Sequence, residues 1–165
     1  MACRHGATWR AGSWFRQEEA EGHAVRAGYL YAAMADVAAL TGNDSILNAI
    51  DRIWNNMVDK KIYVQGSVGA IGSGERYGNN YELPNATAYN ETCAAIANVY
   101  WNHRMFLLHG DAKYMDLLEK ILYNGLISGI GLDGKSFSCY IFTSARAGSP
   151  DVKSESRQQG SSGLI

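Results

Sequence analysis

The chain has 165 residues, of which 47% are hydrophobic and 19% charged, and its formal net charge is −1. This is one domain's length with enough apolar residues for a core, and the small charge gives no electrostatic reason to expect nucleic acid or an anionic membrane as a partner. No apolar run approaches the roughly 18 residues of a membrane span, and the N-terminal residues lack the apolar core of a secretory signal, which predicts a cytoplasmic protein.

A strong helix is expected from Gln17, where the run EEAEGHAVRAGYLYAAMADVAALTG is rich in Ala, Leu and Tyr and ends at Gly42. Asn43 or Asp44 then caps a second helix over residues 44–61. One apolar stripe runs along that helix: Ile46, Leu47, Ile50, Ile53, Trp54 and Met57. A short turn joins the two helices, so the sequence predicts an antiparallel helical hairpin.

A Gly- and Asn-rich loop that starts at Gly72 leads into a third helix, which is expected to begin around Asn90 with Asn90 or Thr87 as its cap. Glu91 and Cys93 therefore lie at a helix N-terminus. Because this position favours anions, we expect it to lower the pKa of the thiol and to stabilise the carboxylate.

The hairpin is then repeated. The segment LHGDAKYMDLLEKILYN matches LTGNDSILNAIDRIWNN, with Leu108 lying 68 positions after Leu40, and the same offset sets His23 opposite Glu91. Repeated helical hairpins bury their apolar faces only by stacking, in a solenoid or in a closed α/α toroid. In a toroid, equivalent helix starts face one mouth, which would bring His23 and Glu91 together.

The predicted organisation is a loosely ordered segment at residues 1–16, a helical domain at 17–143, and a Ser-, Gly- and Arg-rich tail at 144–165 that is expected to be disordered. Glycine-bounded apolar pieces at residues 60–70 and 127–137 predict short strands or extended loops at the toroid mouth. The three cysteines are widely spaced without a CxxC pair, which indicates a reduced compartment and no disulfide framework.

Four segments resemble the catalytic domain of glycoside hydrolase family 127, the β-L-arabinofuranosidases and their uncharacterised relatives: GHAVRAGYLYAAMADVAALTG, GERYGNNYELPN, YNETCAAIANVYWNHRMFLLHGDAKYMD and LYNGLISGIGLDGKSF. The resemblance implies a mainly α fold, part of an (α/α)6 barrel, and release of terminal β-L-arabinofuranosyl groups from a glycan with retention. It further implies that Glu75 is the general acid/base, that Glu91 and Cys93 are two zinc ligands, and that His23 contacts the sugar.

The family's nucleophile and last zinc ligand come from an adjacent Cys-Cys pair downstream of LDGKSF, and this chain has no such pair. We therefore expect an incomplete zinc site and an internal piece of the enzyme, from a truncated gene model, a frameshift near residue 138 or an alternative product. Two functions stay open. One is a glycoside hydrolase piece that is inactive alone, and the other is a non-catalytic helical fragment acting through exposed apolar faces, which also predict self-association.

Overall fold

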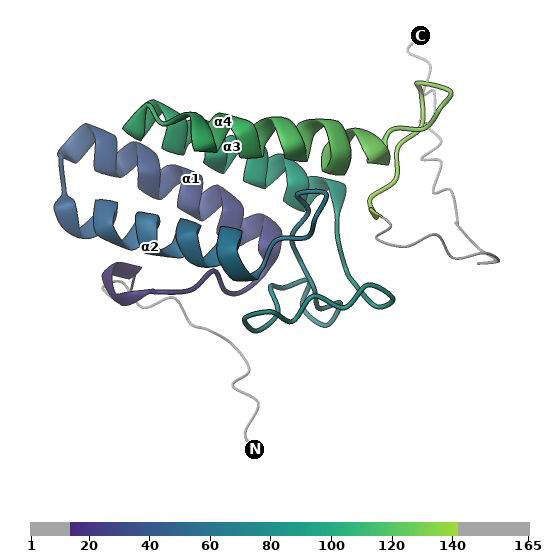
Figure 1. Cartoon of the computed structure of the whole chain (residues 1–165), viewed down its shortest axis with the longest axis horizontal. Coiled ribbons are helices and arrows are strands. Elements are labelled where there is room, and N and C mark those ends of the chain that lie inside the picture. Colours follow the sequence, from purple (N-terminus) through teal and green to yellow (C-terminus); the bar gives the residue numbers. More distant parts are fainter. Residues whose placement is uncertain (1–13, 142–165) are drawn as a thin grey trace, which may run out of the picture.

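Two helical hairpins make up the part of the chain that the computed structural model describes, residues 14–141 (Figure 1). The first consists of α1 (Ala24–Thr41) and α2 (Asp44–Lys60), and the second of α3 (Thr92–His109) and α4 (Ala112–Lys120). A 3-10 turn, η1 (Trp14–Arg16), precedes them, and α4 continues into a π-helical turn, η2 (Ile121–Leu126), and a 3-10 turn, η3 (Ile127–Gly129). The predicted hairpins are therefore present.

The first helix ends at the glycine that the sequence predicts, and the third helix ends at its equivalent. Gly42 and Gly110 both adopt left-handed backbone conformations, with φ of +61° and +71°, and their N–H groups bond back to the last turns of α1 and α3. Asn43 caps α2 by accepting hydrogen bonds from the N–H groups of Ser45 and Ile46. These caps allow each hairpin to reverse direction within two residues.

The internal repeat is visible in the bounds of the helices. Residues 24–41 and 92–109 are related by an offset of 68 positions, as are the first residues of α2 and α4. The two first helices pack side by side, closely enough that a Cβ added at Gly28 would lie 2.9 Å from the Cβ of Ala97. Equivalent helix starts consequently lie at one end of the molecule.

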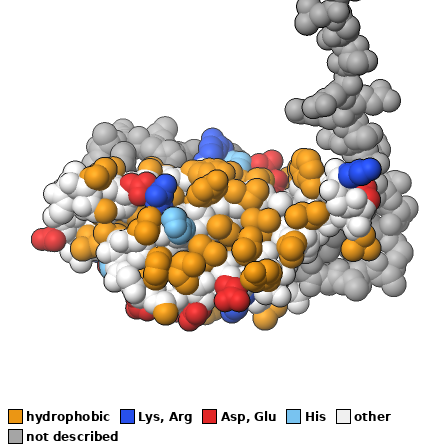
Figure 2. Space-filling model, turned by 90° about the horizontal axis from the view of Figure 1, so that it is seen from above, with side chains coloured by type: hydrophobic (Ala, Val, Ile, Leu, Met, Phe, Trp, Pro, Cys, Tyr) orange, Lys and Arg blue, Asp and Glu red, His pale blue; other side chains and the backbone are white. Residues whose placement is uncertain are grey.

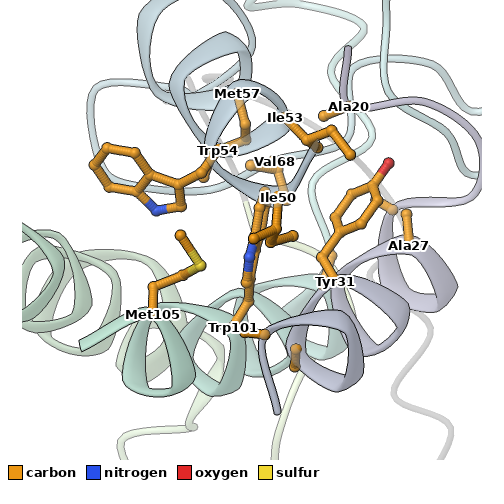
Figure 3. Close-up of a cluster of buried hydrophobic side chains, with 14 of the residues drawn as sticks. Ala20, Ala27, Tyr31, Ile50, Ile53, Trp54, Met57, Val68, Trp101 and Met105 are labelled. Carbon is orange, nitrogen blue, oxygen red and sulfur yellow. The ribbon is translucent and has the colours of Figure 1, made fainter. Parts of the chain in front are cut away.

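The core lies between α1, α2 and α3 (Figure 3). The rings of Tyr31 and Trp101 are 4.8 Å apart, and Ile50 and Ile53 are completely buried beside them. Trp54 donates a hydrogen bond to Asn102 at 2.9 Å, which satisfies the indole N–H inside the core. The predicted stripe of α2 thus supplies its centre.

Some expectations are corrected. The first helix begins at Ala24 rather than Gln17, because the Tyr31 hydroxyl accepts hydrogen bonds from the Gln17 side chain (2.7 Å) and the Glu21 N–H (3.2 Å) and holds this segment outside the helix. The third begins at Thr92, with Glu91 as its N-cap.

Of the short strands or extended loops expected at residues 60–70 and 127–137, the structure has loops at 61–70 and 130–137 with isolated bridges such as the one between Ile130 and Phe137, while residues 127–129 are helical. No strand forms within residues 14–141. Residues 14–16 form a helical turn where loose order was expected. The remainder of the N-terminal segment and the predicted tail at 144–165 lie outside the described residues. None of the described helices is long and apolar enough to cross a membrane.

Candidate active site

His23 and Glu75 form a hydrogen-bonded pair at the start of α1, with His23 Nε2 and Glu75 Oε2 2.8 Å apart. His23 is the N-cap residue, and its Nδ1 accepts a hydrogen bond from the N–H of Val25 at 3.3 Å. An imidazole nitrogen that accepts carries no proton, so the ring proton lies on Nε2 and faces the carboxylate. The ring is thereby fixed from both sides.

Glu75 is held in an unusual backbone conformation. Its φ is +49°, in the left-handed region that side-chain-bearing residues rarely adopt. A tight turn enforces this: the N–H of Glu75 donates to Gly72, and Ile71 and Arg76 exchange two backbone hydrogen bonds of 3.1 and 3.0 Å. Such strain often accompanies functional sites, and here it directs a half-exposed carboxylate toward His23.

Glu91 occupies the equivalent position at the start of α3. It is 8% exposed, its side chain makes no capping hydrogen bond, and its Oε2 has no hydrogen-bond partner. Burial raises the pKa of Glu91, the Glu75 carboxylate raises it further, and His23 opposes the rise. The Glu91 carboxylate is thus close to the His23–Glu75 pair, and one of its oxygens has no hydrogen-bond partner.

Cys93 lies two residues further along α3 and is a free, exposed cysteine. Desolvation of the thiol raises its pKa, the Glu91 carboxylate adds to the rise, and the backbone N–H groups of Ala94 and Cys93 lower it less. The expectation that the helix N-terminus lowers this pKa is wrong, because desolvation and a neighbouring negative charge outweigh the helix terminus. The Glu91 carboxylate is likewise less favoured than expected.

His23, Glu75, Glu91 and Cys93 are called the helix-start cluster below. The structure brings these four predicted residues to the same end of α1 and α3, which the 68-residue repeat anticipated for His23 and Glu91. Two carboxylates, an imidazole and a thiol in this arrangement can donate and accept protons.

Two tyrosines beside the cluster were not anticipated. The hydroxyls of Tyr89 and Tyr140 are 3.2 Å apart, and the two rings meet edge to face at 5.3 Å. Their hydrogen bond and partial desolvation raise the pKa of Tyr89, with Glu91 and Glu75 contributing. Tyr140 is brought there by a bridge to Glu91, a contact between residues distant in sequence that no local pattern reveals.

The donors fit half of a zinc site. A thiol and a carboxylate with an unpartnered buried oxygen are suitable zinc ligands, but such sites need about four. Within residues 14–141, no group of three or more His, Cys, Asp or Glu side chains is arranged to hold a metal ion. Glu91 and Cys93 therefore need further ligands to complete such a site.

Comparison with known proteins gives consistent results. The family model described as "Beta-L-arabinofuranosidase, GH127 catalytic domain" matches residues 11–161. A non-reducing end β-L-arabinofuranosidase from Bifidobacterium longum subsp. longum is 42% identical over 135 residues, which are 82% of this chain and 20% of that protein.

Two solved structures agree closely with the helices described above. A GH127 β-arabinofuranosidase superposes with a TM-score of 0.75 at 64% identity, over 77% of this chain and 20% of the other. A GH127 β-L-arabinofuranosidase from Geobacillus stearothermophilus T6 also gives 0.75, at 48% identity, over 76% of this chain and 20% of the other. The chain spans about one fifth of the length of these relatives.

Proposed function

Because this chain belongs to the GH127 β-L-arabinofuranosidase catalytic-domain family and its hairpins form part of an (α/α)6 barrel, we propose that the helix-start cluster is part of a retaining glycoside hydrolase site. The observation that carries the proposal is the meeting of the His23–Glu75 pair with buried Glu91 at equivalent helix starts. The substrate class is a glycan with terminal L-arabinofuranosyl groups, as the relatives' names suggest.

Glu75 is the general acid/base in this proposal. Its carboxylate is half-exposed, so it can reach a glycosidic oxygen, and the 2.8 Å contact with His23 orients it. An acid/base residue protonates the leaving oxygen and later removes a proton from water. His23, which bonds that carboxylate through its Nε2 proton, would contact the sugar on which Glu75 acts.

Glu91 and Cys93 would hold a zinc ion together with ligands from outside the described residues. When bound, zinc would supply a Lewis acid that keeps a coordinating thiol deprotonated. Binding the cation would give the unpartnered Oε2 of Glu91 a partner and would neutralise the negative charge that burial disfavours. The raised pKa of the Cys93 thiol means that the chain's own charges do not favour a thiolate there without a cation.

Retention requires a nucleophile roughly 5 Å from the acid/base, on the opposite side of the anomeric carbon. The chain has no adjacent cysteine pair to supply it, and the other reactive groups of the cluster are assigned to the metal. We therefore expect no measurable turnover of an aryl β-L-arabinofuranoside by this chain alone, with or without zinc. Activity that disappears in both Glu75→Gln and Cys93→Ala would show that a different nucleophile operates.

The proposal is tested in a chimera. Residues 14–141 replace the corresponding fifth of the Geobacillus enzyme, and hydrolysis is measured for the parent chimera, Glu75→Gln and the control Glu119→Gln, an exposed carboxylate on α4. We expect Glu75→Gln to lower kcat by about 10²–10⁴-fold and Glu119→Gln to leave it unchanged. Equal rates for the two variants would refute the role given to Glu75.

A second function rests on the exposed apolar side chains of α1 and α3. Leu40 is 86% and Leu107 61% exposed, and Tyr29 and Tyr100 form an exposed aromatic pair. Hydrophobic side chains are spread over the face shown in Figure 2 as well. Such surfaces mark interaction sites, so a non-catalytic helical module is the alternative that an inactive chimera would favour.

A further inference from the structure

A polar network lies at the C-terminal end of α2, centred on the buried ammonium group of Lys61. The residue is 4% exposed, and its Nζ donates to Glu19 Oε2 at 3.0 Å and to the Ala20 carbonyl at 2.9 Å. The family resemblance assigned no role to these residues. We propose that Lys61 and its partners are positioning residues that hold the His23–Glu75 pair together.

Two asparagines close the network into a ring. The N–H of Ala20 donates to Asn56 Oδ1 at 3.0 Å, the Asn56 amide donates to Asn80 Oδ1 at 2.9 Å, and the Asn80 amide donates to Glu19 Oε1 at 2.9 Å. Each carboxylate oxygen of Glu19 is therefore paired. A closed set of satisfied polar groups in a partly buried place fixes one geometry, because any displacement leaves a donor or acceptor unpaired.

The ring joins the two segments that carry His23 and Glu75. Ala20 precedes His23 by three residues and Asn80 follows Glu75 by five. Between these anchors the segments are joined by backbone hydrogen bonds from Ala24 N–H to Glu75 O at 2.9 Å and from Tyr77 N–H to Gly22 O at 3.0 Å. The network thus fixes Ala20 and Asn80, the ends of two chain segments whose opposite ends, His23 and Glu75, meet at the site.

Glu75 needs this support. A left-handed conformation at a side-chain-bearing residue persists only where the surroundings impose it. The local turn at Gly72 sets the backbone of Glu75, and the backbone hydrogen bonds from Ala24 and Tyr77 join it to the His23 segment. The Lys61 network holds the far ends of both segments from the end of α2, so it keeps these backbone hydrogen bonds in register.

The inference rests on the proposed function only for the role of the His23–Glu75 pair in catalysis, so its test uses the isolated chain and no substrate. The probe is the ¹⁵N NMR signature of the His23 ring, which reports whether the proton is on Nε2, together with hydrogen exchange of the Ala24 and Tyr77 amides. A merely structural role of Lys61 would change global stability but would not redistribute the His23 ring proton.

The variants are Lys61→Met, which keeps the stem and removes the charge, and the control Arg104→Met, which removes an exposed ion pair with Asp36. Lys61→Met removes both hydrogen bonds of the charged Nζ, and loss of even one charged hydrogen bond corresponds to about a ten-fold change in an opening equilibrium. We expect Lys61→Met to speed exchange of the Ala24 and Tyr77 amides by about that factor relative to Arg104→Met, and to abolish the single Nε2–H signature of His23.

Asn80→Ala serves as the second variant, because it opens the ring without leaving a buried charge unpaired. If Lys61→Met does not fold, the same two measurements on Asn80→Ala test the inference. A His23 signature and amide protection in Asn80→Ala equal to those of Arg104→Met would overturn the inference. If the signature is lost while the chimera described above is inactive, the positioning holds and the proposed function fails, so the two failures are distinguishable.

Discussion

The most informative single change is Glu91→Gln in the metal-free chain. It removes a negative charge from a side chain that is 8% exposed, has an unpartnered oxygen and lies near a second carboxylate. A Gln side chain leaves the same atom without a partner, but it removes the extra cost of burying a charge, which is on the order of a few kcal/mol, whereas a carboxylate at a helix N-terminus contributes only about 0.3–1 kcal/mol. Burial exceeds the helix term, so we expect Gln to stabilise the fold by about 1–2 kcal/mol, or about 3–6 °C in Tm.

The effect depends on pH in a defined direction. Because the folded-state pKa of Glu91 is raised above its ordinary value of 4.5, the folded chain binds the proton more tightly than the unfolded chain does. The stabilisation from protonated Glu91 is complete below pH 4.5 and is lost as the pH rises through the folded-state pKa. The gain from Glu91→Gln should therefore appear at pH 7 and vanish at pH 4.

The measurement is urea denaturation with a chelator at both pH values, for the wild type, Glu91→Gln and the control Glu119→Gln. A Glu91→Gln variant that is no more stable than the control at pH 7, or equally stabilised at both pH values, would show that the Glu91 carboxylate is not strained and would remove the physical reason for a cation there. Such stabilisation of a functional site by mutation is a common consequence of keeping a charged group buried for function.

Three further predictions follow from the same contacts. Metal analysis after dialysis should find zinc well below one equivalent, since Glu91 and Cys93 supply two ligands, and stoichiometric zinc lost in Cys93→Ser would reveal a completed site. The Lys61 hydrogen bond lowers the pKa of Glu19, so the ionised Glu19 carboxylate stabilises the fold above pH 4.5 and this stabilisation is lost as the pH falls through the lower folded-state pKa. In urea denaturation, Glu19→Gln should remove this loss of stability at acid pH. Sedimentation should show self-association that Leu40→Glu with Leu107→Glu reduces, whereas a concentration-independent monomer in the wild type would count against the exposed faces as interfaces.

The repeat was the most reliable guide to the fold. The glycine stops at Gly42 and Gly110 depend on local backbone chemistry, and the 68-residue offset depends on matching apolar positions, so both are visible in one sequence. The helix start was missed because Tyr31 and Lys61, distant in sequence, bind the segment before Ala24. Long-range hydrogen bonds here override local helix propensity.

The residues of the candidate site could be predicted from the sequence, but the directions of their pKa shifts could not. The resemblance named His23, Glu75, Glu91 and Cys93, and the structure places them at one end of the hairpins. The direction of the pKa shifts at Glu91 and Cys93 could not be inferred, because it depends on burial and on a neighbouring carboxylate from another segment. The contact of Tyr140 with Glu91 was hidden for the same reason.

The central claim is that Glu75 transfers the proton to the oxygen of the departing group. It is tested most directly by measuring how kcat of the chimera depends on the acidity of the leaving group. Aryl β-L-arabinofuranosides with acidic and with weakly acidic phenols are compared for the parent and for Glu75→Ala. Only the weakly acidic phenols need protonation as they leave, so the account predicts a loss of about 10²–10⁴-fold in kcat for these and a much smaller loss for the acidic phenols. An equal loss for both kinds of substrate would contradict the assignment.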